Sequence, residues 1–146
     1  MNLNRIKRTC YRIREKIIAS DNLRPYLDKD LAGTCAIASR LVYEKLKSQG
    51  YSVKFCKGKF IENRYDEDDS FLCDHCWVEL EFNNQIYIVD LTLTQFIKDA
   101  NKVSFIQPDN KIFLKYKAKN KFDIELINFQ RVFQKWPYYQ MPFFEI

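Results

Sequence analysis

Three side chains in this sequence have the types and the order needed for thiol-based nucleophilic catalysis: Cys35, His75 and Asp90. In such chemistry a cysteine attacks a carbonyl carbon, and a histidine takes the thiol proton and later donates it to the leaving group. An aspartate fixes the tautomer and orientation of the imidazole. His75 is the only histidine among the 146 residues. The elements that carry these residues decide whether they can meet.

Cys35 falls at the first turn of a predicted helix, which begins at Cys35 and is ended by Gly50. Gly33 permits a turn, Thr34 is a good N-cap residue, and apolar residues recur at four-residue steps afterwards. The unpaired N–H groups and the positive dipole end of a first helical turn favour a thiolate, so Cys35 is a candidate nucleophile. The structural alternative is that a cysteine flanked by alanines only packs the helix on a sheet.

Residues 71–93 predict a β-hairpin. Asn83-Asn84 tolerates the left-handed backbone of a two-residue turn, and the flanking residues alternate in polarity. If Phe82 faces Gln85, one face of the hairpin is wholly apolar. That face comprises Cys76, Val78, Leu80, Phe82, Tyr87, Val89 and Leu91.

In this register His75 and Asp90 fall together on the other face of the hairpin. They are diagonal neighbours, about 7–8 Å apart at the backbone, so the carboxylate can reach an imidazole nitrogen. A slip of one residue would place them on opposite faces. The hairpin therefore predicts a histidine–aspartate pair, and Cys35 supplies a nucleophile for it.

The sequence also resembles a known superfamily. The stretch GTCAIASRLVYEKLKSQGY, followed by DHCWVELEFNNQIYIVDLTLTQF, looks like the core of the papain-like superfamily in its transglutaminase-like branch. Small bacterial members such as lasso-peptide leader peptidases and papain-like toxin domains show a similar pattern. The resemblance covers residues 31–97 and implies an α+β fold, with Cys35 as nucleophile, His75 as base and Asp90 as orienting residue.

The order Cys–His–Asp does not choose the reaction, since peptidases, glutamine deamidases, transglutaminases and arylamine acetyltransferases share it. The sequence also departs from papain-type enzymes, which keep an oxyanion-donating glutamine shortly before the nucleophile. No glutamine lies between Ser20 and Cys35. The backbone N–H of Cys35, with a side chain from elsewhere, is the expected donor set.

We therefore expect a thiol-dependent amide hydrolase or acyltransferase that acts on a peptide or protein through a thioester. Cysteine peptidase and glutamine deamidase are the leading hypotheses, and transfer to an amine stays open. Thr34, Asp74 and Trp77, which flank the nucleophile and the histidine, are predicted substrate-binding residues. We expect no metal and no cofactor.

Two other classes of function compete with catalysis. Cys73-Asp74-His75-Cys76 contains a CxxC, which suggests structural zinc, but a second ligand pair is missing and the two cysteines of a strand would point to opposite faces. A redox CxxC expects its first cysteine at a helix start, which Cys73 is not. The remaining alternative is a non-catalytic interaction module with the same fold.

The rest of the chain supplies packing elements. Apolar residues at steps of three and four predict an amphipathic packing helix over residues 3–19. Alternation predicts a strand over 51–61 with a bulge or end at Gly58, and the acidic segment 62–70 reads as a loop that could border a cleft. Further along we expect a helical turn over 94–100, strands near 102–106, 111–117 and 121–127, and an aromatic strap, WPYYQMPFF, near the end.

Length and composition favour one domain spanning residues 1–146. The net charge of +5 is spread along the chain and no nucleic-acid-binding signature is present, which argues against nucleic acid as the main partner. An odd number of cysteines, five, and basic residues where a signal peptide would be apolar favour a reduced, cytoplasmic protein; secretion without a signal stays open. No apolar run is long enough to span a membrane. The oligomeric state is left open.

Overall fold

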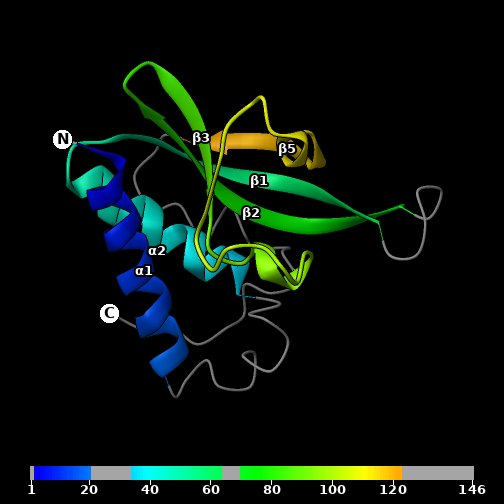
Figure 1. The fold of residues 1–146 in the computed structure, drawn as a ribbon, viewed down its shortest axis with the longest axis horizontal. Coiled ribbons are helices and arrows are strands. Elements are labelled where there is room, and N and C mark those ends of the chain that lie inside the picture. Colours follow the sequence, from blue (N-terminus) through cyan, green and yellow to red (C-terminus); the bar gives the residue numbers. More distant parts are fainter. Residues whose placement is uncertain (1, 21–33, 64–69, 123–146) are drawn as a thin grey trace.

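The computed structural model describes residues 2–20, 34–63 and 70–122, and they form two helices packed on a five-stranded antiparallel sheet (Figure 1). This is the predicted α+β class. The helices are α1 (Leu3–Ala19) and α2 (Cys35–Ser48). The strands are β1 (Ser52–Asn63), β2 (Ser70–Phe82), β3 (Gln85–Asp90), β4 (Ser104–Ile106) and β5 (Tyr116–Phe122).

The strand order in the sheet is β4-β3-β2-β1-β5, and each neighbouring pair is antiparallel. Both helices lie on one side of the sheet (Figure 1). There α2 contacts β1 and β2, and α1 packs on α2. The predicted helix over 3–19 is confirmed. Its buried stripe comprises Ile6, Cys10, Ile13 and Ile17.

The helix-facing side of the sheet is the apolar hairpin face that the sequence predicts. Cys76, Val78 and Leu80 of β2 pack in one buried cluster with Val89 and Leu91. Helix α2 adds Cys35, Ala38, Val42 and Leu46 to the same cluster. Burying this apolar surface from both layers is the main force that holds the helices on the sheet.

The opposite side of the sheet is also buried, under a second apolar cluster. Trp77, Ile88 and Tyr116 belong to it. Two short 3-10 helices, η2 (Leu93–Gln95) and η3 (Lys111–Lys115), bring residues that cover this side, among them Leu93, Ile112 and Phe113. Both faces of the sheet are therefore covered, and the face that carries His75 is buried.

The hairpin register is confirmed. Phe82 pairs with Gln85 and Val78 with Val89. Asn83 and Asn84 take φ values of 52° and 63°, which is the left-handed region that a two-residue hairpin turn requires. Because the register is the predicted one, His75 and Asp90 lie on the same face.

Strand β1 is longer than predicted and shortens the acidic loop. Glu62 pairs with Phe71 and Asn63 with Ser70, so the ends of the expected 62–70 loop belong to strands; residues 64–69 are outside the described part. The expected irregularity at Gly58 is present as a register shift between Lys57 and Gly58 in the pairing with β5.

The prediction of a strand over 111–117 is wrong. The Asn110 side chain accepts a hydrogen bond from the Ile112 backbone N–H at 3.0 Å, which starts the 3-10 helix η3 instead. Strand β5 begins only at Tyr116, so it replaces both the end of that predicted strand and the start of the one over 121–127. The strand near 102–106 is β4, and the helical turn over 94–100 contains η2.

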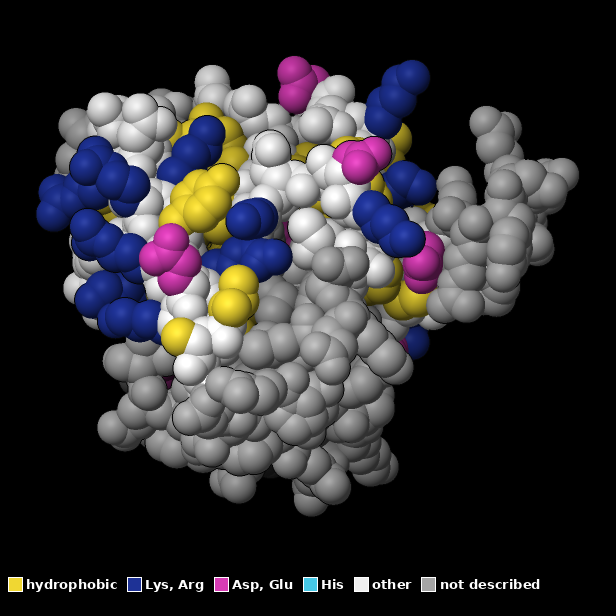
Figure 2. Space-filling view, turned by 60° about the horizontal axis from the view of Figure 1, so that its bottom comes forward, with side chains coloured by type: hydrophobic (Ala, Val, Ile, Leu, Met, Phe, Trp, Pro, Cys, Tyr) yellow, Lys and Arg dark blue, Asp and Glu magenta, His cyan; other side chains and the backbone are white. Residues whose placement is uncertain are grey.

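Several predictions fall on undescribed residues: the link between residues 20 and 34, the end of the 121–127 strand and the aromatic strap. None of the helices in residues 2–20, 34–63 and 70–122 is both long and apolar enough to cross a bilayer. Figure 2 shows Lys and Arg side chains gathered on the side where α1 lies, and no histidine on this face. The exposed basic residues of α1 are Arg5, Arg8, Arg12 and Lys16.

Candidate active site

Cys35 is the first residue of α2, as the sequence predicts. Thr34 occupies the N-cap position; its carbonyl accepts from the Ala38 N–H at 2.9 Å, but its side chain makes no capping hydrogen bond. The first-turn N–H groups of a helix have no intrahelical acceptor, so they carry partial positive charge toward the Cys35 sulfur. Only 2% of Cys35 is exposed.

The sulfur of Cys35 lies beside a part of β2 that is not paired with β3. Strand β3 pairs with β2 only as far as Val89 opposite Val78 and ends at Asp90, whereas β2 extends back to Ser70. Cys76 lies in this unpaired part, and its thiol and backbone favour the ionised form of Cys35 and so lower the pKa of Cys35.

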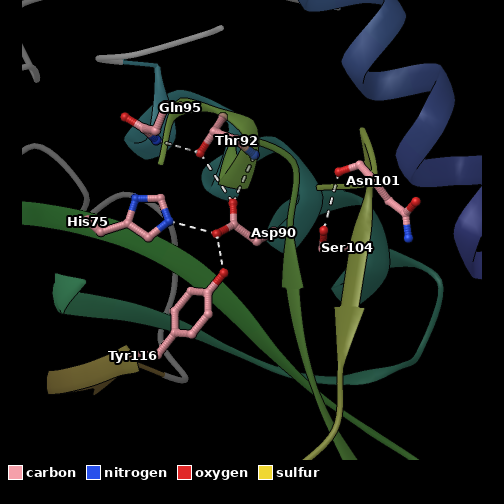
Figure 3. A network of polar contacts seen from close by, with 7 residues as sticks. All are labelled: His75, Asp90, Thr92, Gln95, Asn101, Ser104 and Tyr116. Atoms are coloured by element: carbon pink, nitrogen blue, oxygen red, sulfur yellow. Dashed lines mark hydrogen bonds and ion pairs between the residues drawn. The ribbon is translucent and has the colours of Figure 1, made fainter. Parts of the chain in front are cut away.

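His75 and Asp90 form a buried pair, with Nε2 of the imidazole 2.7 Å from Oδ2 of the carboxylate (Figure 3). His75 is 0% and Asp90 1% exposed. Tyr116 donates its hydroxyl to the same Oδ2 at 2.7 Å. The other oxygen, Oδ1, accepts from the Thr92 backbone N–H at 2.8 Å and from its hydroxyl at 3.2 Å. Both carboxylate oxygens are therefore fixed.

A further contact supports this network from η2. Gln95 Nε2 donates to Thr92 Oγ1 at 3.1 Å (Figure 3). The Thr92 hydroxyl is thus held by one acceptor and one donor, so its orientation toward Asp90 is defined.

The environment keeps Asp90 ionised. Burial raises the pKa of this carboxyl, but the charge and hydrogen bond of His75 outweigh burial, and the bonds from Tyr116 and Thr92 add to the effect. The net pKa of Asp90 is below its ordinary value. A buried carboxylate with four donors is the arrangement expected of an anion that must stay charged.

His75 and Cys35 shift in opposite directions. Burial lowers the pKa of His75, but the Asp90 carboxylate and the Cys35 sulfur overcome it and raise that pKa to about 10. The hydrogen bond from the Cys76 thiol lowers the pKa of Cys35 most; burial opposes this and His75 reinforces it, giving a pKa of about 5. Near neutral pH the favoured state is a thiolate beside an imidazolium.

The second ring nitrogen, Nδ1, is the one left for the thiol. It is buried and has no hydrogen bond of ordinary geometry to the described residues. Figure 3 shows Nδ1 on the part of the ring away from the carboxylate. Because Nε2 is bound to Asp90 and the ring interacts with Cys35, Nδ1 is the ring nitrogen available to the sulfur.

Aromatic side chains enclose the imidazole. Phe96 meets the His75 ring edge to face at 4.9 Å between centroids, and Trp77 lies at 5.8 Å with a tilt of 30°. Phe60 and Tyr116 each lie 5.9 Å away. These contacts hold the ring in one orientation and lower the local dielectric, which strengthens the interactions with the two charged neighbours.

The three predicted substrate-binding residues are placed differently. Thr34 and Trp77 adjoin the site but are buried, and Trp77 packs on His75 and Tyr116. Asp74 alternates with His75 along β2, so it lies on the other face, where it pairs with Lys59. Contact of these residues with a substrate stays a prediction.

The CxxC does not assemble a metal site. In the described parts of the chain no group of three or more His, Cys, Asp or Glu side chains has a metal-holding arrangement. Cys73 donates its thiol to Glu62 Oε2 at 3.3 Å, whereas Cys76 faces the helices. The two sulfurs therefore lie on opposite faces of β2, as strand alternation predicts.

Sequence reasoning missed three residues of the site: Thr92, Tyr116 and Cys76. Thr92 had a local signal, because an aspartate side chain commonly accepts from the backbone two residues on. Tyr116 had none, since it comes from β5, at the far edge of the sheet from β3. Cys76 was assigned to the apolar face, and its contact with Cys35 depends on where α2 begins.

No protein-family model, curated protein or solved structure matches this chain.

Proposed function

We propose that the protein is a cysteine hydrolase of the papain-like, transglutaminase-like type, which cleaves or transfers an amide of a peptide or protein through a thioester on Cys35. One observation supports the proposal most: His75 Nε2 is bound to Asp90 at 2.7 Å, and the buried Nδ1 on the same ring has no hydrogen bond to the described residues and is free to serve Cys35. The order of the groups, from carboxylate to imidazole to thiol, is the one that thiol catalysis requires.

In the first half of the reaction the Cys35 thiolate attacks the amide carbon. The negative charge that develops on the carbonyl oxygen is stabilised by backbone N–H groups at the start of α2, including that of Cys35 itself. The His75 imidazolium then gives its Nδ1 proton to the leaving amine, and a thioester remains on Cys35.

In the second half neutral His75 takes a proton from the incoming water or amine as that group attacks the thioester. Collapse of the second tetrahedral species releases the product and restores the thiolate–imidazolium pair. Asp90 stays ionised throughout and holds Nε2, so only Nδ1 exchanges protons. Tyr116 and Thr92 hold Asp90 in turn.

Substrate must reach a sulfur that is almost fully covered. Because Cys35 is 2% exposed and His75 0%, an amide can contact the sulfur only after a local opening. This requirement favours an amide on a flexible segment or a projecting glutamine side chain, and both peptide cleavage and glutamine deamidation meet it.

The test is Cys35-dependent change of mass. Wild-type protein and the Cys35→Ala variant are each incubated with candidate proteins and peptides, and intact masses are recorded. Deamidation adds about 1 Da per site, proteolysis gives fragments, and transglutamination joins an amine with loss of about 17 Da. We expect one of these changes with the wild type and none with Cys35→Ala.

His75→Gln and Asp90→Asn serve as further variants, because they keep side-chain volume while removing the base or its charge. Both should lower the rate of whichever mass change the wild type produces. If a broad proteome shows no Cys35-dependent change, the interaction-module hypothesis replaces the catalytic one.

A further inference from the structure

Strand β2 has an open edge next to the candidate site. Strand β3 pairs with β2 only over residues 78–82 and ends at Asp90, whereas β2 begins at Ser70. On its other side β2 pairs with β1 all the way from Ser70 to Glu81. Among the described residues, no strand pairs with residues 70–77 of β2 on the side of β3. The sheet therefore ends there in a strand that has a neighbour on one side only.

The hairpin register shows which backbone groups point to this edge. Phe82 and Gln85 flank the two-residue turn, where facing residues exchange their backbone hydrogen bonds. Because the direction of hydrogen bonding alternates along a strand, every second residue before Phe82 turns its N–H and C=O groups to the β3 side. Leu72 and Asp74 are in this series and lie beyond the end of β3. They offer two donors and two acceptors to an added strand.

The edge reaches the protein surface at these two residues. Leu72 is 65% exposed, and the side chain of Asp74 is 32% exposed. Asp74 forms its ion pair with Lys59 of β1, so its carboxylate is directed away from the open edge. The next residue of β2 is the buried His75. The open edge therefore runs from the surface directly to the proposed base.

The proposed nucleophile and base also meet at this edge. Cys35 belongs to the apolar cluster under the helices, whereas the His75 ring packs on Phe60 and Trp77 of the cluster on the opposite side of the sheet. The sheet separates these two sides wherever its strands are paired. An amide in contact with both groups must therefore lie beside β2, past the end of β3.

We propose that a peptide substrate binds in an extended conformation as an added strand along the open edge of β2, with its backbone paired to Leu72 and Asp74. The inference rests on the proposed function and names its substrate class, an unfolded polypeptide segment. An exposed strand edge recognises the backbone of any extended chain, because each N–H and C=O group finds a complementary partner. Side-chain contacts, such as those that the exposed Leu72 offers, add sequence preference.

The first measurement is amide hydrogen exchange by NMR on the full chain with Cys35→Ala, which prevents turnover. The probe is a pool of short capped peptides of random sequence in large excess. In the free protein the amides of Leu72 and Asp74 should exchange faster than those of Cys73 and His75, which face β1. The pool should slow Leu72 and Asp74 at least about tenfold. A pool methylated at every backbone nitrogen cannot donate and should have no effect.

The variant Leu72→Pro tests the edge from the side of the protein. Because the Leu72 N–H points away from β1, proline removes a donor of the edge and keeps the pairing between β1 and β2. Leu72→Ala is the matched control, since it removes the side chain and keeps the N–H. Proline should weaken binding of the pool at least about tenfold, and alanine less than about threefold. The remaining amide signals verify that both variants are folded.

Two results would overturn the proposal. One is protection of the Leu72 and Asp74 amides in the free protein, because the chain itself would then occupy the edge. The other is equal binding of the pool by Leu72→Pro and Leu72→Ala. The amide-exchange result does not depend on any variant of the edge, so it decides the question even if the proline variant fails to fold.

The proposed function is tested separately, by the Cys35-dependent change of mass. If that change proceeds at the same rate in Leu72→Pro as in the wild type, the function stands and the edge is not its substrate site. If the pool protects Leu72 and Asp74 but no mass changes, the proposed function is wrong and the edge binds peptide without catalysis.

Discussion

Asp90 is the residue on which the geometry of the site depends most. It accepts four hydrogen bonds from three residues, His75, Thr92 and Tyr116, and is 1% exposed. Hydrogen bonds to a buried charge each contribute about 1.5–3 kcal/mol, and an unsatisfied buried charge costs more. The set of donors around Asp90 therefore fixes the position of the His75 ring as well as the charge.

The change Tyr116→Phe removes one donor from Asp90 and keeps the ring that packs on Phe60 and Trp77. We expect the free energy of unfolding, measured in urea at pH 7, to fall by about 1–3 kcal/mol. The pKa of Asp90 should rise relative to wild type, because one bond that favours its ionised form is gone.

A matched control for that change is Tyr87→Phe. The Tyr87 hydroxyl donates to Gln85 Oε1 at 3.0 Å on the surface, away from the site, so its loss should change stability by less than about 0.5 kcal/mol. If the free energy of unfolding falls equally in the two variants, the Tyr116 hydroxyl contributes no more than a surface hydroxyl and does not stabilise Asp90.

Among the individual residues of the site, the sequence predicts only some. Cys35, His75 and Asp90 follow from residue type, a helix start and a hairpin register, which are all local patterns. The Tyr116 contact joins residues of β3 and β5, which β2 and β1 separate in the strand order. No pattern within one segment carries that information.

Among the elements, β1 decides where β5 and its tyrosine lie. Phe60 pairs with Tyr116, and the register with β5 shifts at Lys57/Gly58. A Cβ on Gly58 would lie 2.1 Å from the Lys117 carbonyl oxygen, closer than any real contact. Gly58 is therefore required for the approach of β5, and β5 carries a donor to Asp90.

The change Gly58→Ala should push β5 away from β1 and destabilise the protein by about 1–3 kcal/mol, the usual cost of overpacking. Thermal or urea unfolding measures the loss. Gly50→Asn is the control: φ is +89° there, nothing lies within 4 Å, and asparagine tolerates a left-handed backbone, so a small effect is expected. A Gly58→Ala protein as stable as wild type would show that the close approach is not rigid.

The elements that the sequence predicts correctly are those with strong periodicity. Residues 3–19 repeat at helical spacing and form α1 as predicted; residues 71–93 alternate around two turn residues and form the hairpin in the predicted register, although β3 ends at Asp90. Residues 111–117 also alternate, yet the Asn110 side chain starts a 3-10 helix there and Leu114 is 66% exposed. Alternation in a short segment does not separate a strand from a short 3-10 helix.

For the whole molecule, the site lies where two buried clusters meet across one sheet. Cys35 belongs to the cluster under the helices, whereas Trp77 and Tyr116, which pack around His75, belong to the other. Cys35 and His75 interact with each other, and His75 lies in the part of β2 that β3 leaves unpaired. Folding of both layers is therefore needed before the thiol meets its base.

This linkage predicts a pH-dependent contribution of Cys35 to stability. Its pKa falls from 9.0 to about 5 in the folded state, so the folded state binds fewer protons than the unfolded one between these values. The contribution is present at high pH and is lost as pH falls through 5. Relative to Cys35→Ser, wild-type stability in urea should increase from pH 5 to pH 8; a constant difference would contradict the thiolate state.

The most direct test of the central claim, that His75 activates Cys35, is the rate at which iodoacetamide alkylates each of the five thiols at pH 6, followed by peptide mapping. With its pKa of about 5, Cys35 is largely thiolate at this pH, and through the same local opening that admits substrate we expect it to react at least about tenfold faster than the other four. His75→Gln, checked for folding by circular dichroism, should reduce the difference, because His75 supplies part of what lowers the Cys35 pKa. A Cys35 rate equal to those of the other thiols, or unchanged in His75→Gln, would contradict the account and leave Cys35 as a packing residue.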